Sequence, residues 1–163
     1  MTVVSIASLT QHAQNLCRQL ANIRQEENEV KRPIIFVAHS MGGLLTKKAL
    51  LHSTESNPTE INSIVTNPSG ILFMGTPHAG SMNATIGSFV ATLISIFHPT
   101  NTSLLMDLEK ESPNLQELDR RFNQLLTRRN TANDPIHIRC FYESVPMTGI
   151  NGLVCERPPQ LRK

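Results

Sequence analysis

The sequence predicts an α/β fold, in which a mainly parallel sheet is flanked by helices. Short apolar runs typical of strands alternate along the chain with longer stretches of helical periodicity. This alternation favours parallel strand pairing through right-handed crossovers. Two of the apolar runs also stop at loops rich in glycine and other small residues. In a parallel sheet such loops gather at the carboxyl ends of the strands, where we expect a functional site.

The first helix is expected from Ser5 to Glu27, because apolar residues recur there at helical spacing. A strand is expected from Pro33 to Val37. Its continuous, β-branched apolar run is typical of a strand that is covered on both faces. Small residues then break the run, and a second helix is expected from Leu44 to His52. The apolar stripe of the first helix consists of Leu9, Ala13, Leu16 and Leu20.

The middle of the chain contains a second short strand. Residues 67–70 (Asn-Pro-Ser-Gly) predict a turn, and Ile71–Met74 predict the strand that follows it. Residues 84–97 are expected to be helical. This stretch includes the most apolar later window, which is too short for a bilayer span of about 20 residues.

The last part of the chain predicts a long helical region and a third strand. The helical region covers residues 104–129, and Pro113 is expected to start its final helix with Ser112 as the cap. The third strand is expected from Ile136 to Tyr142. The apolar stripe of the helical region consists of Leu108, Leu115, Leu118, Phe122 and Leu125.

Size and composition are those of one modest folded domain. The chain has 163 residues, of which 39% are hydrophobic and 17% are charged. Its formal net charge of +2 argues against a nucleic-acid partner. The paired basic residues are expected to be solvated helix faces, and they are Lys47-Lys48, Arg120-Arg121 and Arg128-Arg129.

The cysteines and histidines predict neither a disulfide framework nor a metal site. The cysteines are few and odd in number, and no zinc spacing occurs among them or the histidines. No cofactor is expected. The N-terminus lacks the basic region and apolar core of a signal peptide, so an intracellular, reducing compartment is expected.

Ser40 is the strongest candidate for chemistry. The segment Ala38-His39-Ser40-Met41-Gly42 follows a predicted strand and precedes a predicted helix. This is the context of the Gly-x-Ser-x-Gly nucleophile elbow, with alanine replacing the first glycine. A serine there lies near the positive end of the helix, where backbone N–H groups stabilise a developing oxyanion. The alternative interpretation is an ordinary serine in a tight strand–helix turn.

The neighbours of Ser40 have expected roles of their own. The small residues Ala38, Gly42 and Gly43 allow the strand and helix to pack closely around the turn. The Met41 N–H is expected to be one of the two oxyanion donors. His39 points in a different direction from Ser40, so it is a poor general base. We expect it to pack or hydrogen-bond beneath the turn.

Two further loops are predicted to reach the same edge of the sheet. Gly75 and His78 follow the second strand, and Glu143 follows the third. Gly75 and His78 are expected to shape the floor of the site. The simpler interpretation of His78 is a loop histidine whose side chain hydrogen-bonds to the backbone. Glu143 is the candidate catalytic acid. A solvated carboxylate at a strand end is an equally good interpretation.

Together these segments resemble one group of α/β-hydrolases. The matching stretches are Arg32 to Gly43, Gly70 to Ser81 and Ile138 to Glu143. They are similar to the lipase-like serine esterase family that includes the serine-active-site-containing proteins. The resemblance implies an α/β-hydrolase fold, Ser40 as nucleophile and Glu143 as acid. It also implies ester or phospholipid substrates and association with mitochondrial or endoplasmic-reticulum membranes.

The chain departs from the family pattern at both ends. The hydrolase order is serine, acid, histidine, yet no histidine follows Glu143. The early strands and their oxyanion loop are also missing. Residues 1–154 are therefore expected to be an incomplete hydrolase domain, and 155–163 a disordered tail. Since serine is a poor nucleophile without a base, the isolated chain is expected to be weak or inactive.

Three functions remain open at this level. The first is a serine hydrolase that forms an acyl-enzyme at Ser40. The second is a non-catalytic signalling or interaction module, fused to a larger protein. The third is a truncated gene product.

Overall fold

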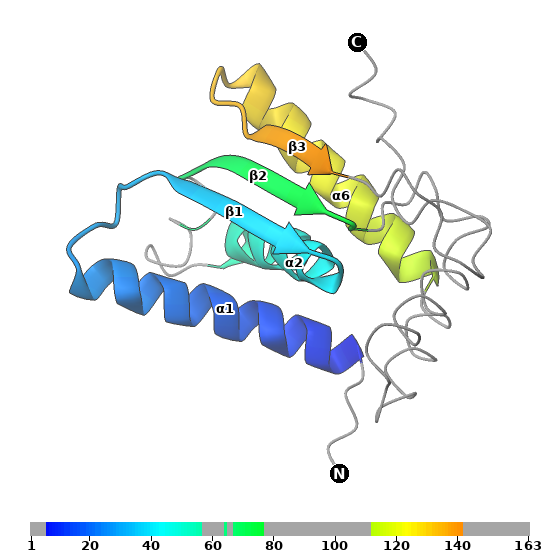
Figure 1. Ribbon diagram of the computed structural model, residues 1–163, viewed down its shortest axis with the longest axis horizontal. Coiled ribbons are helices and arrows are strands. Elements are labelled where there is room, and N and C mark those ends of the chain that lie inside the picture. The colour runs from blue at the N-terminus through cyan, green and yellow to red at the C-terminus, as the bar shows by residue number, and fades with distance from the viewer. Residues whose placement is uncertain (1–5, 57–63, 65–66, 77–111, 142–163) are drawn as a thin grey trace.

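The computed structural model describes residues 6–56, 64, 67–76 and 112–141 of the chain (Figure 1). It contains a three-stranded sheet in the order β1-β2-β3, and both neighbouring pairs are parallel. The predicted α/β fold with a parallel sheet flanked by helices is confirmed. Its elements are α1 (Ile6–Glu26), β1 (Ile34–His39), α2 (Met41–Glu55), β2 (Pro68–Met74), α6 (Ser112–Thr131) and β3 (His137–Phe141).

The helices α2 and α6 cover one face of the sheet, and in Figure 1 both lie behind the strands. Two right-handed crossovers that step in the same direction across a parallel sheet place their helices on the same face. The core between these layers includes Ala38, Ile71 and Phe73 from the strands. The predicted stripe of α6 is confirmed where it is described, because Leu115, Leu118, Phe122 and Leu125 all belong to this core.

The helix α1 packs along α2 and extends the covered layer. Its buried residues Ala13 and Cys17 lie in one cluster with Ala49 of α2 and Ile34 of β1. The Cys17 thiol donates a hydrogen bond to the Ala49 carbonyl oxygen at 3.3 Å. Burial disfavours the thiolate and raises the pKa of Cys17 to about 11. The prediction of an amphipathic first helix is thus confirmed.

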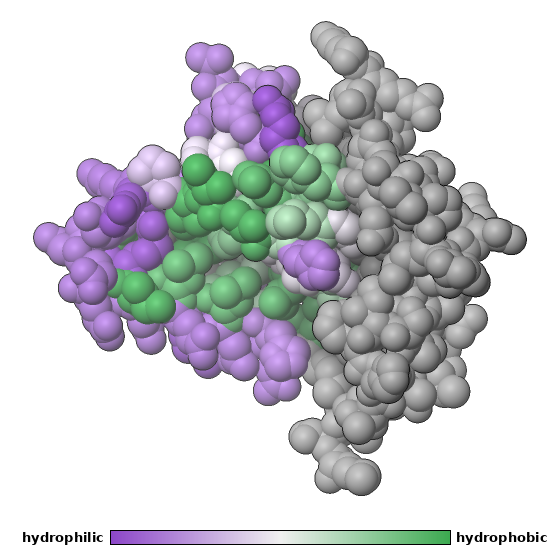
Figure 2. Space-filling view, in the orientation of Figure 1, coloured by the Kyte–Doolittle hydropathy of each residue, from purple (hydrophilic) through white to green (hydrophobic). Residues whose placement is uncertain are grey.

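No helix in the described part of the chain covers the other face of the sheet, which we call the open face. The expectation that the first strand is covered on both faces is wrong. In β1, Ile34 and Ala38 are buried against the helices, whereas Ile35 and Val37 are 64% and 67% exposed. Figure 2 shows an apolar surface over the strands on this side. The continuous apolar run correctly predicted a strand, but among the residues that the structure describes, helices cover only one of its two faces.

Two element boundaries also differ from the predictions. The turn expected at 67–70 is instead largely strand, because β2 begins at Pro68, which lies beside Ile34 in the register. Pro68 is tolerated as the first residue of the strand, and the Ile34 N–H donates to the carbonyl of Asn67 at 2.9 Å. The helix α2 begins at Met41, immediately after Ser40 and before the predicted start.

Lys47 is buried, contrary to the expectation of a solvated helix face. Its side chain is 1% exposed, and its ammonium lies 2.5 Å from the Asp119 carboxylate of α6. The same nitrogen lies 5.5 Å and 5.7 Å from the ring centroids of Phe73 and Phe122. Pairing and cation–π contact compensate for the lost hydration of the charge.

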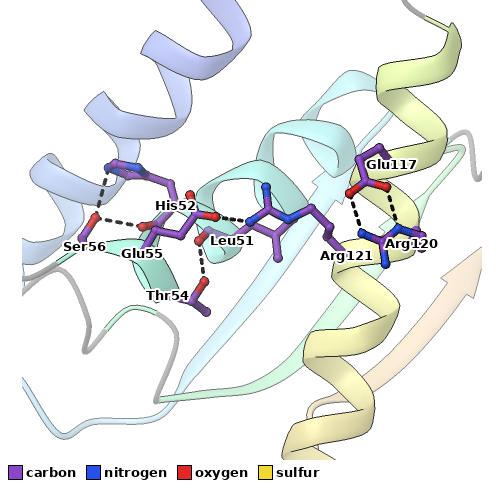
Figure 3. Close-up of polar contacts among 8 residues, drawn as sticks. All are labelled: Leu51, His52, Thr54, Glu55, Ser56, Glu117, Arg120 and Arg121. Atoms are coloured by element: carbon purple, nitrogen blue, oxygen red, sulfur yellow. Dashed lines mark hydrogen bonds and ion pairs between the residues drawn. The ribbon is translucent and has the colours of Figure 1, made fainter.

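A second ion pair connects the same two helices at the surface. Arg121 of α6 binds Glu55 near the carboxyl end of α2 (Figure 3). Arg120 lies on the exposed side of α6 and binds Glu117, and this hydrogen bond is the main reason why the pKa of Glu117 is lowered. The solvated-face prediction therefore holds for Arg120.

Candidate active site at the strand–helix junction

Ser40 occupies the junction between β1 and α2. Its backbone has φ 53° and ψ −124°, a left-handed conformation that costs a non-glycine residue on the order of 1–3 kcal/mol. Ser40 stands at the N-cap of α2, but its side chain makes no capping hydrogen bond. An ordinary N-cap serine satisfies a helix N–H with its hydroxyl. The strain at Ser40 therefore does not serve helix capping.

Backbone hydrogen bonds fasten this turn on both sides. The Ser40 N–H donates to the Met74 carbonyl at 2.8 Å, which continues the pairing of β1 with β2. The Gly43 N–H donates to the Ser40 carbonyl at 3.1 Å, which closes the first turn of α2. Ser40 is thus fixed between a sheet and a helix, as a strained position requires.

The Ser40 hydroxyl oxygen is buried and has no hydrogen-bond partner in the part of the chain that the structure describes. Leaving a buried polar atom unpaired costs about 1–3 kcal/mol. His39 does not supply the partner. It is exposed on the open face of the sheet, since side chains alternate along β1. The expectation that His39 packs or hydrogen-bonds beneath the turn is therefore wrong.

The small residues around Ser40 have unequal roles. A Cβ atom on Gly43 would lie 2.2 Å from the side-chain oxygen and methyl carbon of Thr76, so only glycine fits. A Cβ on Gly42 would meet nothing within 4 Å. Ala38 is buried at the end of β1. Close packing around the turn therefore depends on Gly43 rather than on Gly42.

Thr76 is a site residue that the sequence analysis did not single out. It is fully buried, it lies against Gly43, and its hydroxyl also has no hydrogen-bond partner among the described residues. The sequence signal that points to Thr76 is its position in the Gly-Thr-Pro-His loop directly after a predicted strand. Its contact with Gly43 follows from the register of β1 and β2, which the sequence does not state.

The carboxyl ends of the strands meet at this edge, as predicted for a parallel sheet. Gly75 has φ 54°, and its N–H donates to the Phe141 carbonyl at 2.9 Å. Ser40, Gly75 and Phe141 are therefore linked through neighbouring strand ends. His78 and Glu143 lie outside the described residues, and their roles stay predictions.

The amino end of α2 supplies the electrostatics of the site. Met41 opens the helix, and N–H groups in a first turn have no preceding helical carbonyl to bind. The helix dipole adds partial positive charge there. Met41 directly follows Ser40 at this positive end of the helix, and its role as an oxyanion donor stays a prediction.

Metal and membrane features were also sought in the described part of the chain. Over those ranges, no group of at least three histidine, cysteine, aspartate or glutamate residues could hold a metal ion. None of the helices seen there has the length and apolar character needed to cross a membrane.

The fold and the junction define an α/β-hydrolase-like domain, in which a serine stands on a strained turn between a parallel strand and a helix. Residues 1–117 match the family described as "PGAP1-like alpha/beta domain". The chain belongs to this family. No solved structure matches the chain significantly.

Curated relatives resemble this chain over most of its length. Protein SERAC1 of Danio rerio is 34% identical over 139 residues, which cover 85% of this chain and 19% of that protein. Protein SERAC1 of Bos taurus is 33% identical over 115 residues, or 71% of this chain and 16% of that protein. The Homo sapiens protein is 30% identical with the same coverage. The chain thus spans less than a fifth of the length of these relatives.

Proposed function

We propose that this domain is a serine hydrolase that cleaves esters through an acyl-enzyme at Ser40. The observation that carries the proposal is the conformation of Ser40, which is strained at φ 53° and is not used for helix capping. Its hydroxyl is also left without a partner among the described residues. Strain and unpaired polar groups that a fold maintains occur preferentially at functional sites.

The chemistry follows from the position of Ser40. The serine oxygen attacks the ester carbonyl carbon while a base removes its proton, and negative charge develops on the carbonyl oxygen. The helix α2 begins at Met41, directly after Ser40, and the Met41 N–H is our proposed donor to that charge. Collapse releases the alcohol, which takes a proton, and water then hydrolyses the acyl-serine. Glu143 is our proposed acid, acting through a histidine outside the described residues.

The proposed substrates are carboxylic or phospholipid esters, with action at a mitochondrial or endoplasmic-reticulum membrane. This part of the proposal is supported by the resemblance to the lipase-like serine esterases. It concerns the longer protein, because the chain covers 19% or less of the length of its relatives.

A second candidate is a non-catalytic hydrolase-like module of a larger protein. The supporting observation is that the base needed by Ser40 is not found within residues 6–56, 64, 67–76 and 112–141. In that case the elbow would be retained for binding rather than for turnover.

A fluorophosphonate probe, which reacts covalently with activated serines, distinguishes the two candidates. We expect a full-length form of the protein to be labelled, and tryptic mass spectrometry to locate the adduct on Ser40, whereas the isolated 163-residue chain should label weakly or not at all. Ser40→Ala should abolish labelling. The matched control Ser69→Ala removes a hydroxyl from the adjacent strand β2, where it bonds the Ile34 carbonyl, and should leave labelling intact. Absence of labelling in the folded full-length protein would favour the non-catalytic module.

A further inference from the structure

Two buried hydroxyl groups at the strand–helix junction have no hydrogen-bond partner among the described residues. One belongs to Ser40, and the other belongs to Thr76, which follows β2. Thr76 has no exposed surface at all. Valine has nearly the same shape as threonine and no polar group to leave unpaired, so packing alone favours valine at this position. The hydroxyl of Thr76 therefore calls for an explanation in the chemistry of the site.

The Thr76 hydroxyl lies over the first turn of α2. Its oxygen and its methyl carbon both lie 2.2 Å from the point that a Cβ atom on Gly43 would occupy. In a helix the Cα–Cβ bond tilts toward the amino end, so this point lies over the preceding turn. Ser40 stands three positions before Gly43, a spacing that shares one helix face. The Thr76 hydroxyl thus lies on the side of Gly43 that faces Ser40.

Backbone hydrogen bonds hold the two hydroxyl-bearing residues in this relation. The Ser40 N–H donates to the carbonyl of Met74, two residues before Thr76, at 2.8 Å. The Gly43 N–H, whose residue contacts the Thr76 side chain, donates to the Ser40 carbonyl at 3.1 Å. These bonds close a circuit that begins and ends at Ser40. Within this circuit, the remaining freedom of each hydroxyl oxygen is rotation about χ1.

We propose that Thr76 is a positioning residue, whose hydroxyl hydrogen-bonds the Ser40 hydroxyl and orients it for attack. A change of the Ser40 rotamer brings the two oxygens together and pairs both buried groups at once. Thr76 donates its hydrogen to the Ser40 oxygen, which leaves the Ser40 proton available to the base. This inference rests on the proposed function, because it concerns the reactivity of Ser40.

The proposed role separates reactivity from stability. Thr76→Val keeps the shape of the side chain and removes only the hydroxyl. It should not lower the thermal midpoint, because that hydroxyl binds none of the described residues in this structure, but it should slow the reaction of Ser40. Thr76→Ser keeps the hydroxyl and should react at nearly the wild-type rate. A threonine with a purely structural role would change the midpoint and leave the rate of the folded protein unchanged.

The test is the rate of fluorophosphonate labelling in a full-length form of the protein, measured over a range of probe concentrations. We expect Thr76→Val to lower the limiting rate at saturating probe by about tenfold or more, because a misoriented nucleophile reacts slowly. The half-saturating probe concentration should not change, since Thr76 is fully buried and does not contact the probe. Thermal denaturation of the same variants supplies their midpoints.

Thr46→Val is the matched control. Thr46 is also a buried threonine, and it lies in α2, but its hydroxyl is paired because it donates to the Gly42 carbonyl at 2.8 Å. This variant should label at the wild-type rate and should gain no stability.

Three results would overturn the role of Thr76 while the wild-type protein is labelled. They are a Thr76→Val variant that labels as fast as the wild type or differs only in its half-saturating concentration, a Thr76→Ser variant that does not recover the rate, and a Thr46→Val variant that is slowed as much as Thr76→Val. A folded wild-type protein that is not labelled contradicts the proposed function itself, and this role of Thr76 with it.

Discussion

Both faces of the sheet carry large apolar side chains, but the two faces have different environments. On the covered face, Phe73 and Ile71 are fully buried beneath α2 and α6. On the open face, Val37 and Phe141 remain mostly exposed. Apolar composition is therefore a poor guide to which face contributes to the stability of this chain. The contribution depends on the layer that covers each face.

Charge follows the same division. The covered side encloses the pair between Lys47 and Asp119, next to aromatic rings. The ionisable residues at the open-face positions of the strands are all basic, and they are Arg139, His39 and His137. Buried pairs are sensitive to the loss of one partner, whereas exposed charges are screened by water. Substitutions on the two sides should therefore have very different effects.

The largest contrast is expected between two phenylalanines on neighbouring strands. Phe73→Ala should lower the free energy of unfolding by about 3–5 kcal/mol, because it leaves a cavity in the core. Phe141→Ala, at a 56% exposed position, should cost about 1 kcal/mol or less. Urea denaturation measures both. Equal losses would show that the open face is covered within this chain.

A similar contrast is expected between the two ion pairs that connect α2 and α6. Lys47→Met removes the buried ammonium that pairs with the Asp119 carboxylate, and should cost about 3–5 kcal/mol. Arg121→Met removes the exposed pair with Glu55 and should cost less than about 1 kcal/mol. The double variant Lys47→Met/Asp119→Leu should regain most of the loss. A double variant no more stable than Lys47→Met would contradict this explanation.

Alanine substitutions at Gly42 and Gly43 should change the free energy of unfolding in opposite directions. Gly43→Ala forces a Cβ against Thr76, and such overpacking typically costs about 1–3 kcal/mol. Gly42→Ala meets nothing within 4 Å, and alanine should stabilise the helix by up to about 1 kcal/mol. Thermal denaturation monitored by circular dichroism compares them. Equal effects would argue against close packing of Thr76 beneath α2.

The smallest effect concerns pH. Burial raises the pKa of Cys17 to about 11, so the folded state keeps its thiol proton at a pH where the unfolded chain has lost it. The stabilisation from this group is complete below the unfolded pKa of about 9 and declines as pH rises towards 11. The slope of stability against pH between 9 and 11 should become shallower in Cys17→Ala. An unchanged slope would show that Cys17 ionises alike in both states.

Much of this fold could be predicted from local sequence patterns. Strands, helices and the elbow at Ser40 follow from short-range periodicity and from small residues around a turn. The burial of Lys47 could not be predicted, because its partner Asp119 lies 72 positions later. A lysine in a helix is normally solvated, and only the packing of α6 on α2 reverses this.

Two features of the site also depend on residues distant in the sequence. The pleat of β1 points His39 away from the helices, but a local pattern does not indicate which face the helices cover. The contact of Thr76 with Gly43 depends on the register between β1 and β2. Whether a second layer covers β1 depends on polypeptide far from the strand. A local sequence pattern does not predict such contacts between residues that are far apart in the chain.

We infer that Ser40 is held in a strained conformation that serves chemistry rather than helix capping. The unfolding free energy of Ser40→Gly tests it most directly, because glycine tolerates positive φ. We expect this variant to be more stable than the wild-type chain by about 1 kcal/mol, since it releases backbone strain. An ordinary N-cap serine would give the opposite result, a loss of a few tenths of a kcal/mol. A Ser40→Gly variant that is less stable than the wild-type chain would therefore show that Ser40 is an ordinary N-cap residue.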